Sequence, residues 1–106
     1  MAVTNKQFYI GTLTTTLTTN LYTVPTGSLS IIKEMLISNN DSSARTFTLS
    51  YGVAASEITV WDAITLQAGE TKLVGCATNL LSTQVIDGGA SVNSQVTIVI
   101  SGVEIT

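Results

Sequence analysis

Short runs of alternating β-branched, aromatic and hydroxyl residues, separated by turn residues about every 8–12 positions, recur along this sequence. No window carries apolar residues at the i, i+3, i+4, i+7 spacing of an amphipathic helix with a cap at its start. In the clearest run, Phe47, Leu49 and Tyr51 alternate with threonine and serine. A period of two turns one apolar face toward a core, so the sequence predicts an all-β protein.

The length of the chain limits it to one domain. With 106 residues it can bury about two-thirds of its unfolded surface, and a second independent core would not fit. The runs predict seven to nine strands, enough for a two-sheet antiparallel β-sandwich of jelly-roll or Ig-like topology. We expect residues 1–7 to form an N-terminal arm and residues 8–106 to form a single sandwich domain.

Two turns divide the central part of the sequence. The turn Pro25-Thr26-Gly27 separates a short strand from a longer one at 29–38, which indicates a hairpin. A second turn, residues 39–43, precedes the strand at 45–51. We therefore expect strands 29–38 and 45–51 to pair as the central hairpin of the domain.

Lys33 and Glu34 interrupt the alternation on both faces of the strand at 29–38. Either the strand is buried on both faces near one end or a β-bulge at the charged pair interrupts it; we expect the bulge, with Met35 and Ile37 in the core. Thr-rich residues 8–17 are expected to form a peripheral strand, and Gly88-Gly89 a turn. Other apolar positions are expected in the core because they alternate in the same way: Ile58, Val60, Ile64, Leu66, Val96, Ile98 and Ile100.

Charge is scarce in this chain. Charged residues make up 10%, against about 25% in a typical soluble domain, while hydrophobic residues make up 44% and the mean hydropathy is +0.42. Threonine and serine supply 29 of the 106 residues. A surface rich in hydroxyls and poor in charge favours association, which indicates a protein that works in an assembly. A single β-domain with Thr-rich outer faces fits the composition equally well.

The net charge of −3 argues against nucleic acid as a partner, since the four basic residues are scattered. They are Lys6, Lys33, Arg45 and Lys72. No apolar run approaches the roughly 18–20 residues that span a bilayer, and the N-terminal residues lack the apolar core of a signal peptide. We expect no membrane association and no encoded export.

The sequence contains few of the residues on which enzyme catalysis commonly depends. The absence of histidine removes the base of Ser-His-Asp catalysis and the commonest zinc ligands. The single cysteine, Cys76, excludes an internal disulfide and is expected to be a small hydrophobe. The acidic residues share no motif, and Asn39, Asn40 and Asp41 lack the spacing of an EF-hand, so a turn is the simpler interpretation. We predict that the chain is not an enzyme and binds no cofactor or metal.

Aromatic side chains could in principle form a sugar-stacking platform. The candidates are Trp61, Tyr9, Tyr22 and Tyr51. Three of them stand in alternating strands, where packing in the core is the default role.

Five segments follow one another in a recognisable order: LYTVPTG at 21–27, ISNN at 37–40, TFTLSYG at 46–52, ITLQAGETKLV at 64–74 and VTIVISGVEIT at 96–106. In this order the chain resembles small virion structural proteins of tailed bacteriophages over roughly residues 8–106. Many such chains carry an "L-x-x-GD" step before the penultimate strand, and residues 79–83 lack its glycine.

The resemblance implies a head decoration (cement) protein that stabilises the phage capsid through oligomeric contacts. The alternative is a tail or baseplate component or a receptor- or carbohydrate-binding module, and a cellular carbohydrate-binding module is a third possibility. Implied partners are the major capsid protein or tail proteins and further copies of the chain, with a trimer favoured, in a virion assembled in the host cytoplasm. The residues expected at interfaces are Met1, Ala2, Val3, Phe8, Lys33, Glu34, Asn39 and Asn40.

Overall fold

The structure is a computed structural model that describes residues 2–106, except for the side chains of residues 76 and 77. The roles expected for Met1 and for the Cys76 thiol therefore lie outside the described residues. Over the described range the chain forms eight strands and no helix, hence none that could cross a membrane. The strands are β1 (Val3–Thr12), β2 (Asn20–Thr23), β3 (Leu29–Asn39), β4 (Arg45–Gly52), β5 (Ile58–Leu66), β6 (Thr71–Leu80), β7 (Val85–Ala90) and β8 (Val96–Ile105).

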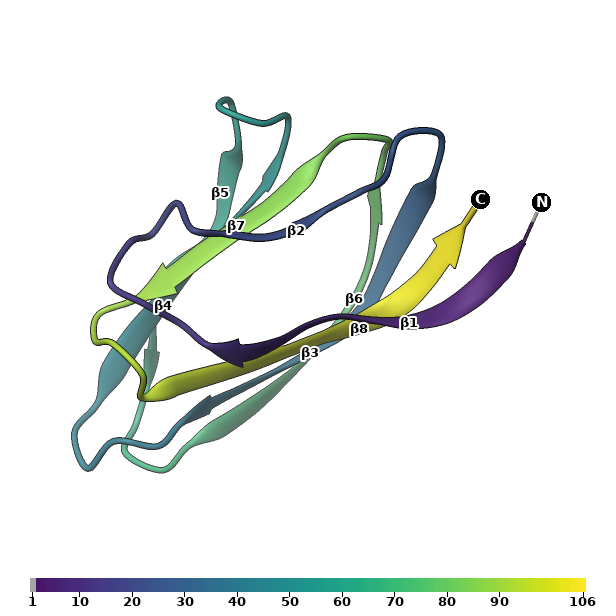
Figure 1. Ribbon diagram of the computed structural model, residues 1–106. Helices are drawn as coiled ribbons and strands as arrows, with labels where there is room; N and C mark the ends of the chain where they lie inside the picture. Colours follow the sequence, from purple (N-terminus) through teal and green to yellow (C-terminus); the bar gives the residue numbers. More distant parts are fainter. Residues whose placement is uncertain (1) are drawn as a thin grey trace.

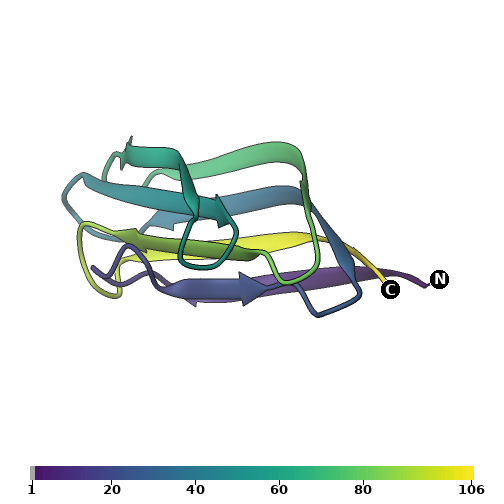
Figure 2. The same ribbon diagram turned by 90° about the horizontal axis from the view of Figure 1, so that it is seen from above.

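The strands form two four-stranded antiparallel sheets that face each other (Figures 1 and 2). The first sheet has the order β1-β8-β3-β6 and the second the order β2-β7-β4-β5. First pairs with last, second with seventh, third with sixth and fourth with fifth. This nesting is one long hairpin wrapped across two layers, the eight-stranded jelly roll. The predicted sandwich is confirmed, and of the two predicted topologies the chain adopts the jelly roll.

The core lies between the two sheets. Met35 and Ile37 of β3 are buried there, as the alternation predicts, and the inward positions of β4 and β8 face them. The fully buried side chains of largest volume are Phe47, Leu13, Ile32, Met35, Ile37, Leu49, Leu66, Leu80, Ile86, Ile98, Ile100 and Val24. Both sheets contribute to this set, so burial of the core holds the two layers together.

The predicted bulge in β3 is confirmed. The register of β3 against β8 shifts between Ile32 and Glu34, which leaves Lys33 as the extra residue, and the register against β6 shifts at the same place. On β8, Gly102 lies opposite Ile32. A Cβ at Gly102 would overlap the carbonyl oxygen of Ile31, so the bulged backbone requires a glycine here.

The two predicted hairpins are wrong. β2 belongs to the second sheet and β3 to the first, so residues 25–28 cross between the layers. Residues 40–44 cross back in the same way, and β4 pairs with β5 and β7 instead of β3. The reason is geometric: stacked sheets lie about 10 Å apart, a distance that a four- or five-residue connection spans as easily as it closes a hairpin.

The Thr-rich segment and the Gly-Gly pair also differ from expectation. β1 ends at Thr12, and residues 13–19 form a loop that lies over β7. Gly88 donates its N–H to Thr19 O (2.9 Å), and Ala90 donates to Thr14 O (2.8 Å). A Cβ at Gly89 would come within 2.6 Å of Thr16 O. The glycines therefore permit the close approach of this loop to a buried strand, and they do not form a turn.

β5 is the exposed edge of the second sheet. Ile64 is partly buried and Leu66 fully buried as predicted, but Ile58 and Val60 are exposed. Among the described strands β5 pairs with β4 alone, and its first residue, Ile58, stands in register with Tyr51 of β4. An edge strand has one side without a neighbouring strand, so it keeps β-branched residues without burying all of them.

The expected N-terminal arm is part of the first sheet. Residues 3–7 belong to β1 and pair with β8. Ala2 and Thr106 also exchange backbone hydrogen bonds, of 3.0 and 2.9 Å, so the two chain ends lie side by side (Figures 1 and 2). This end of β1 is largely exposed, which explains why its sequence is polar and lacks alternation.

Candidate interaction surface

One apolar side chain from each strand lines up across the outer face of the first sheet. Ile10 of β1 lies opposite Val99 of β8, Val99 opposite Leu36 of β3, and Leu36 opposite Leu73 of β6. Directly opposed residues point to the same face of a sheet. Ile10, Leu36 and Leu73 are 62%, 43% and 64% exposed. We call these four residues the apolar row; it crosses the sheet from one edge to the other.

Polar residues border the apolar row on both sides. Two positions along each strand, the register aligns a row of hydroxyls: Thr12, Thr97, Ser38 and Thr71. Ser38 Oγ and Thr71 Oγ1 are 3.0 Å apart and share a hydrogen bond. On the opposite side lies a shallow, open depression at the β3 bulge, whose lining includes Lys33, Glu34 and Ser101. An apolar strip rimmed by polar groups is the usual composition of a contact surface.

A second group of exposed apolar side chains lies on the β4–β5 hairpin. Val53, Ile58 and Val60 are all more than half exposed, and Ile58 reaches 72%. Ser56 donates its N–H to Val53 O (2.8 Å), which closes the turn, and Ile58 pairs with Tyr51. We call these three residues the hairpin patch. It belongs to the second sheet, whereas the apolar row belongs to the first.

The residues expected at interfaces fall into two groups. Lys33 and Glu34 are exposed at the bulge beside the apolar row, and Ala2, Val3 and Asn40 are exposed at the ends of strands. Phe8 and Asn39 are instead buried, and they are corrected here. Phe8 lies in the core, where its ring centroid is 4.6 Å from that of Tyr22.

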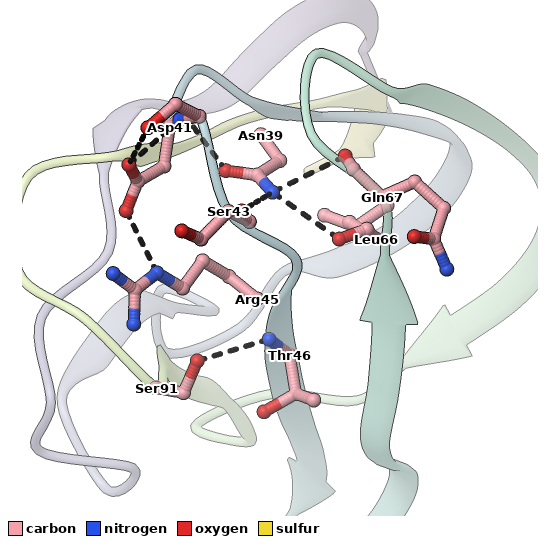
Figure 3. A network of polar contacts seen from close by, with 9 residues as sticks. Asn39, Asp41, Ser43, Arg45, Thr46, Leu66, Gln67 and Ser91 are labelled. Atoms are coloured by element: carbon pink, nitrogen blue, oxygen red, sulfur yellow. Dashed lines mark hydrogen bonds and ion pairs between the residues drawn. The ribbon is translucent and has the colours of Figure 1, made fainter.

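Asn39 holds two loops together from a fully buried position (Figure 3). Its Nδ2 donates to Ser43 O (2.9 Å) and to Leu66 O and Gln67 O (both 3.2 Å). Its Oδ1 accepts the N–H of Asp41 at 3.0 Å. The side chain therefore satisfies backbone groups of both the β3–β4 and the β5–β6 connection, which is a structural role.

Ion pairs brace the ends of the sandwich. At the terminal end, Lys6 Nζ lies 2.9 Å from Glu104 Oε2, and Tyr22 OH donates to the same carboxylate at 3.1 Å. The Lys6 ammonium lowers the pKa of Glu104. At the other end, Arg45 Nε donates to Asp41 Oδ2 at 2.7 Å and lowers the pKa of that carboxyl (Figure 3). Both carboxylates favour the fold above their unfolded pKa, and the benefit is lost as the pH falls through their folded pKa.

Asp87 is a buried carboxyl on β7 that faces Glu57. Its Oδ1 has no hydrogen-bond partner within residues 2–106, and burial together with Glu57 raises the pKa of Asp87. Because the folded pKa lies above the unfolded one, ionisation of Asp87 opposes folding. The penalty is absent below the unfolded pKa, and it grows to its full size above the folded pKa.

Asp87→Asn is therefore expected to raise the melting temperature at pH 8, because the amide removes a buried charge beside Glu57. The gain should shrink toward pH 4, where the wild-type carboxyl is increasingly protonated. Thermal unfolding of both proteins at the two pH values measures this. Asp62→Asn is the control: Asp62 is exposed on β5, so this variant should change the melting temperature little at either pH value. A gain for Asp87→Asn that is larger at pH 4 than at pH 8 would contradict the assignment.

The described residues do not gather into a catalytic or metal-binding constellation. No three His, Cys, Asp or Glu side chains within the described range are placed to hold a metal ion. Of the four aromatic residues considered for sugar stacking, Tyr51 is buried, and Tyr9, Tyr22 and Trp61 are partly buried against the core. The exposed apolar surfaces are thus the candidate functional features of this chain.

The apolar row was not predicted, although a signal for it is present in the sequence. Leu36 stands in the unbroken apolar triplet Met35–Ile37, and Val99 in the triplet Ile98–Ile100. Each triplet places one apolar side chain on the face opposite the core. Their alignment into one row depends on strand register, which is a long-range property.

Comparison with known proteins establishes the fold. No family model and no curated protein matches the sequence. Among solved structures, the Drosophila NLP-core, described for its pentamer formation and histone binding, matches over 100% of both chains at a TM-score of 0.58 and 18% identity. The T13 viral particle of infectious bursal disease virus matches 98% of this chain at a TM-score of 0.54 and 13% identity. The VP2 subviral particle of that virus matches 97% of this chain, also at a TM-score of 0.54, with 12% sequence identity.

These similarities concern the fold alone, because the identities are low. The chain spans about a third of the viral chains, 30% and 32% of their lengths, and the whole of the NLP-core chain. The similar chains form viral particles and a pentamer, and none is described as an enzyme. The jelly roll of this chain is thus a fold that is found in assembly-forming proteins.

Proposed function

We propose that this chain is a non-enzymatic structural protein of a virion, namely a decoration protein that binds the head of a tailed bacteriophage as a homo-oligomer. The observation that carries the proposal is the apolar row, which crosses the full width of an exposed sheet face. An aligned apolar strip on an otherwise hydroxyl-rich face favours contact with another protein surface. The low charge of the chain favours association as well.

The fold supports a structural role in a particle. Chains of the infectious bursal disease virus particle share the jelly roll, and the NLP-core shares it in a pentamer. The ordered segments that resemble phage virion proteins point to the same class, and they add the tailed-phage context.

The physical task of a decoration protein is to bind the assembled shell and not its dissociated parts. Selective binding then stabilises the shell by mass action. A cyclic oligomer, with a trimer favoured, presents several weak contacts at once and gains affinity through multivalency. We assign the apolar row to contacts between copies and the hairpin patch to contacts with the major capsid protein. The site of action is the virion, assembled in the host cytoplasm.

Copy number in purified virions tests this function. Quantitative mass spectrometry is expected to find on the order of hundreds of copies per particle, because a head lattice repeats its sites with icosahedral symmetry. Particles that lack the protein should also release their genome at a lower temperature, and added protein should reverse this. Absence from virions, or only a few copies per particle, would exclude the decoration role.

A tail, baseplate or receptor-binding role is the second candidate. It is favoured by Trp61 on the edge strand β5, an aromatic side chain that is only partly buried against the core. That role predicts about three to a few dozen copies per particle. Glycan-array binding that is lost in Trp61→Ala would favour it over decoration.

Ile58→Lys is expected to weaken binding to undecorated heads at least tenfold, about 1.4 kcal/mol, because it places a charge in the hairpin patch. Sedimentation of protein with heads measures the affinity, and the oligomeric state should not change. Leu81→Lys is the matched control, since Leu81 is also more than half exposed but lies in neither patch. Equal losses for the two variants would argue against the hairpin patch as the shell contact.

A further inference from the structure

We infer that three copies of this chain close around an axis parallel to the strands, with the outer faces of their first sheets turned toward that axis. The three apolar rows then join into one closed apolar belt. The inference rests on the homo-oligomer of the proposed function and names the surface and the arrangement that build it. It follows from the width of the sheet, the direction of its edge strands and the composition of the face.

The width of the first sheet matches a three-sided arrangement. Four strands spaced about 4.8 Å apart make a face about 19 Å wide. If the edge strands at each corner also keep one strand spacing between them, the triangle has sides of about 24 Å and its centre lies about 7 Å from each sheet, while a side chain reaches about 5 Å, half the usual distance between packed sheets. Three faces therefore fill the space with their own side chains. Five faces joined in the same way would leave the centre about 14 Å from each sheet, too far for side chains to meet.

The edge strands of the first sheet fit the corners of this arrangement. All pairs in the order β1-β8-β3-β6 are antiparallel, so β1 and β6, the two edges, run in opposite directions. Rotation about an axis parallel to the strands preserves those directions. At each corner, β1 of one copy therefore meets β6 of the next in antiparallel orientation, the geometry of a sheet ladder. A two-fold face-to-face pair would leave both edges uncovered.

The ends of the apolar row meet at the same corners. Ile10 stands on β1 and Leu73 on β6, and both are more exposed than Leu36 between them. In the trimer, Ile10 of one copy contacts Leu73 of the next, so the row continues without a gap.

The rest of the outer face of the first sheet can be buried in the trimer without leaving a charged side chain unpaired. The neighbouring row consists of hydroxyls, which can bond to one another or to water. The exposed charges near the row, Lys33 and Glu34, have opposite signs and lie at the bulge, so three copies bring equal numbers of both signs to that level, where they can pair between copies. A face of about 19 by 33 Å covers about 600 Å² per copy, roughly 1,800 Å² for the trimer, which is within the range of stable interfaces.

Oligomer mass provides the first test. Wild-type protein is expected to sediment as a trimer at micromolar concentration, and Leu36→Lys as a monomer, because three lysines would meet at the axis. Leu36 is 43% exposed in the single chain, so circular dichroism of the variant should keep the wild-type fold. Leu81→Lys is the control and should remain a trimer. A wild-type monomer, dimer or pentamer, or a trimer that persists in Leu36→Lys, would overturn the arrangement.

Disulfide trapping tests the corner contact. Ile10→Cys and Leu73→Cys are combined in a Cys76→Ser background. The two positions are three strand spacings apart in one copy, about 14 Å, too far for a disulfide within the chain. Mild oxidation is expected to yield covalent trimers, and an Ile10→Cys, Ile58→Cys control should yield none. Failure of the Ile10–Leu73 pair to cross-link would overturn the proposed corner.

The decoration function and the trimeric arrangement can be excluded independently of each other. A trimer with the expected cross-link in a protein that is absent from virions would remove the decoration function and keep the arrangement. Hundreds of copies per virion together with a trimer that Leu36→Lys leaves intact would keep the function and remove the arrangement.

Discussion

The Gly102→Ala variant is expected to lose about 2–4 kcal/mol of unfolding free energy, a large effect for a single methyl group. A Cβ at this position would overlap Ile31 O and lie 3.0 Å from Lys33 N. Both are backbone atoms of the β3 bulge, so no side-chain rotation relieves the contact. β3 and β8 would have to separate at the centre of the first sheet, where β8 also pairs with β1.

Urea and thermal unfolding measure this loss. One kcal/mol shifts the melting temperature of a domain of this size by about 4–8 °C, so the expected loss corresponds to a decrease of roughly 8–32 °C. Gly75→Ala is the matched control: Gly75 lies in β6 opposite Glu34, on the other side of the same bulge, and a Cβ there would meet nothing within 4 Å. Alanine at 75 should change stability little. Similar losses at both positions would show that the close backbone approach does not matter.

The bulge and its glycine illustrate what local sequence can and cannot reveal. The charged pair Lys33-Glu34 breaks the alternation of its own strand, so the bulge is predictable. The need for glycine at 102 arises from strand register between segments some 70 residues apart. Nothing in the sequence around Gly102 marks that partner.

The same limit explains which fold predictions were correct. The all-β class, the sandwich and the core positions of β3, β4 and β8 follow from a period of two, a local signal. The two hairpins were wrong because a short connection between strands does not say whether it stays in one sheet. Gly88-Gly89 resembled a turn because glycine marks both turns and close approaches of backbone.

The apolar row could not be predicted from the sequence for a related reason. Expected interface residues were chosen for polarity and position, which found Lys33 and Glu34 beside the apolar row but also Asn39 and Phe8, which are buried. Asn39 stands in a turn-like sequence, where an exposed side chain is the usual outcome. Its burial depends on the β5–β6 connection, which closes over it from elsewhere in the chain.

Asn39→Ala is expected to destabilise the fold by about 2–4 kcal/mol. The substitution leaves the carbonyls of Ser43 and Leu66 and the N–H of Asp41 without their side-chain partner in a buried site. Each unsatisfied buried group costs about 1–3 kcal/mol, in part offset by relaxation of the two loops and by water. Urea unfolding measures the loss. Asn40→Ala is the matched control and should cost less than about 1 kcal/mol, because Asn40 is exposed and its side chain donates only to Thr97 Oγ1.

Asn39→Asp separates the hydrogen-bonding role of this residue from its size. A carboxylate has the shape of the amide but donates nothing, and it would face three carbonyl oxygens that now accept from Nδ2. Its folded pKa should lie above the unfolded one, so the variant should be least stable above the folded pKa and recover as the pH falls toward the unfolded pKa. Unfolding of Asn39→Asp at pH 4 and pH 8 measures this. Performed in the Leu36→Lys background, the experiment also removes any contribution from contacts between copies. If Asn39→Asp no longer lowers the unfolding free energy in the Leu36→Lys background, Asn39 acts at an interface between copies. If the decrease in unfolding free energy is unchanged in that background, Asn39 stabilises the fold of the single chain.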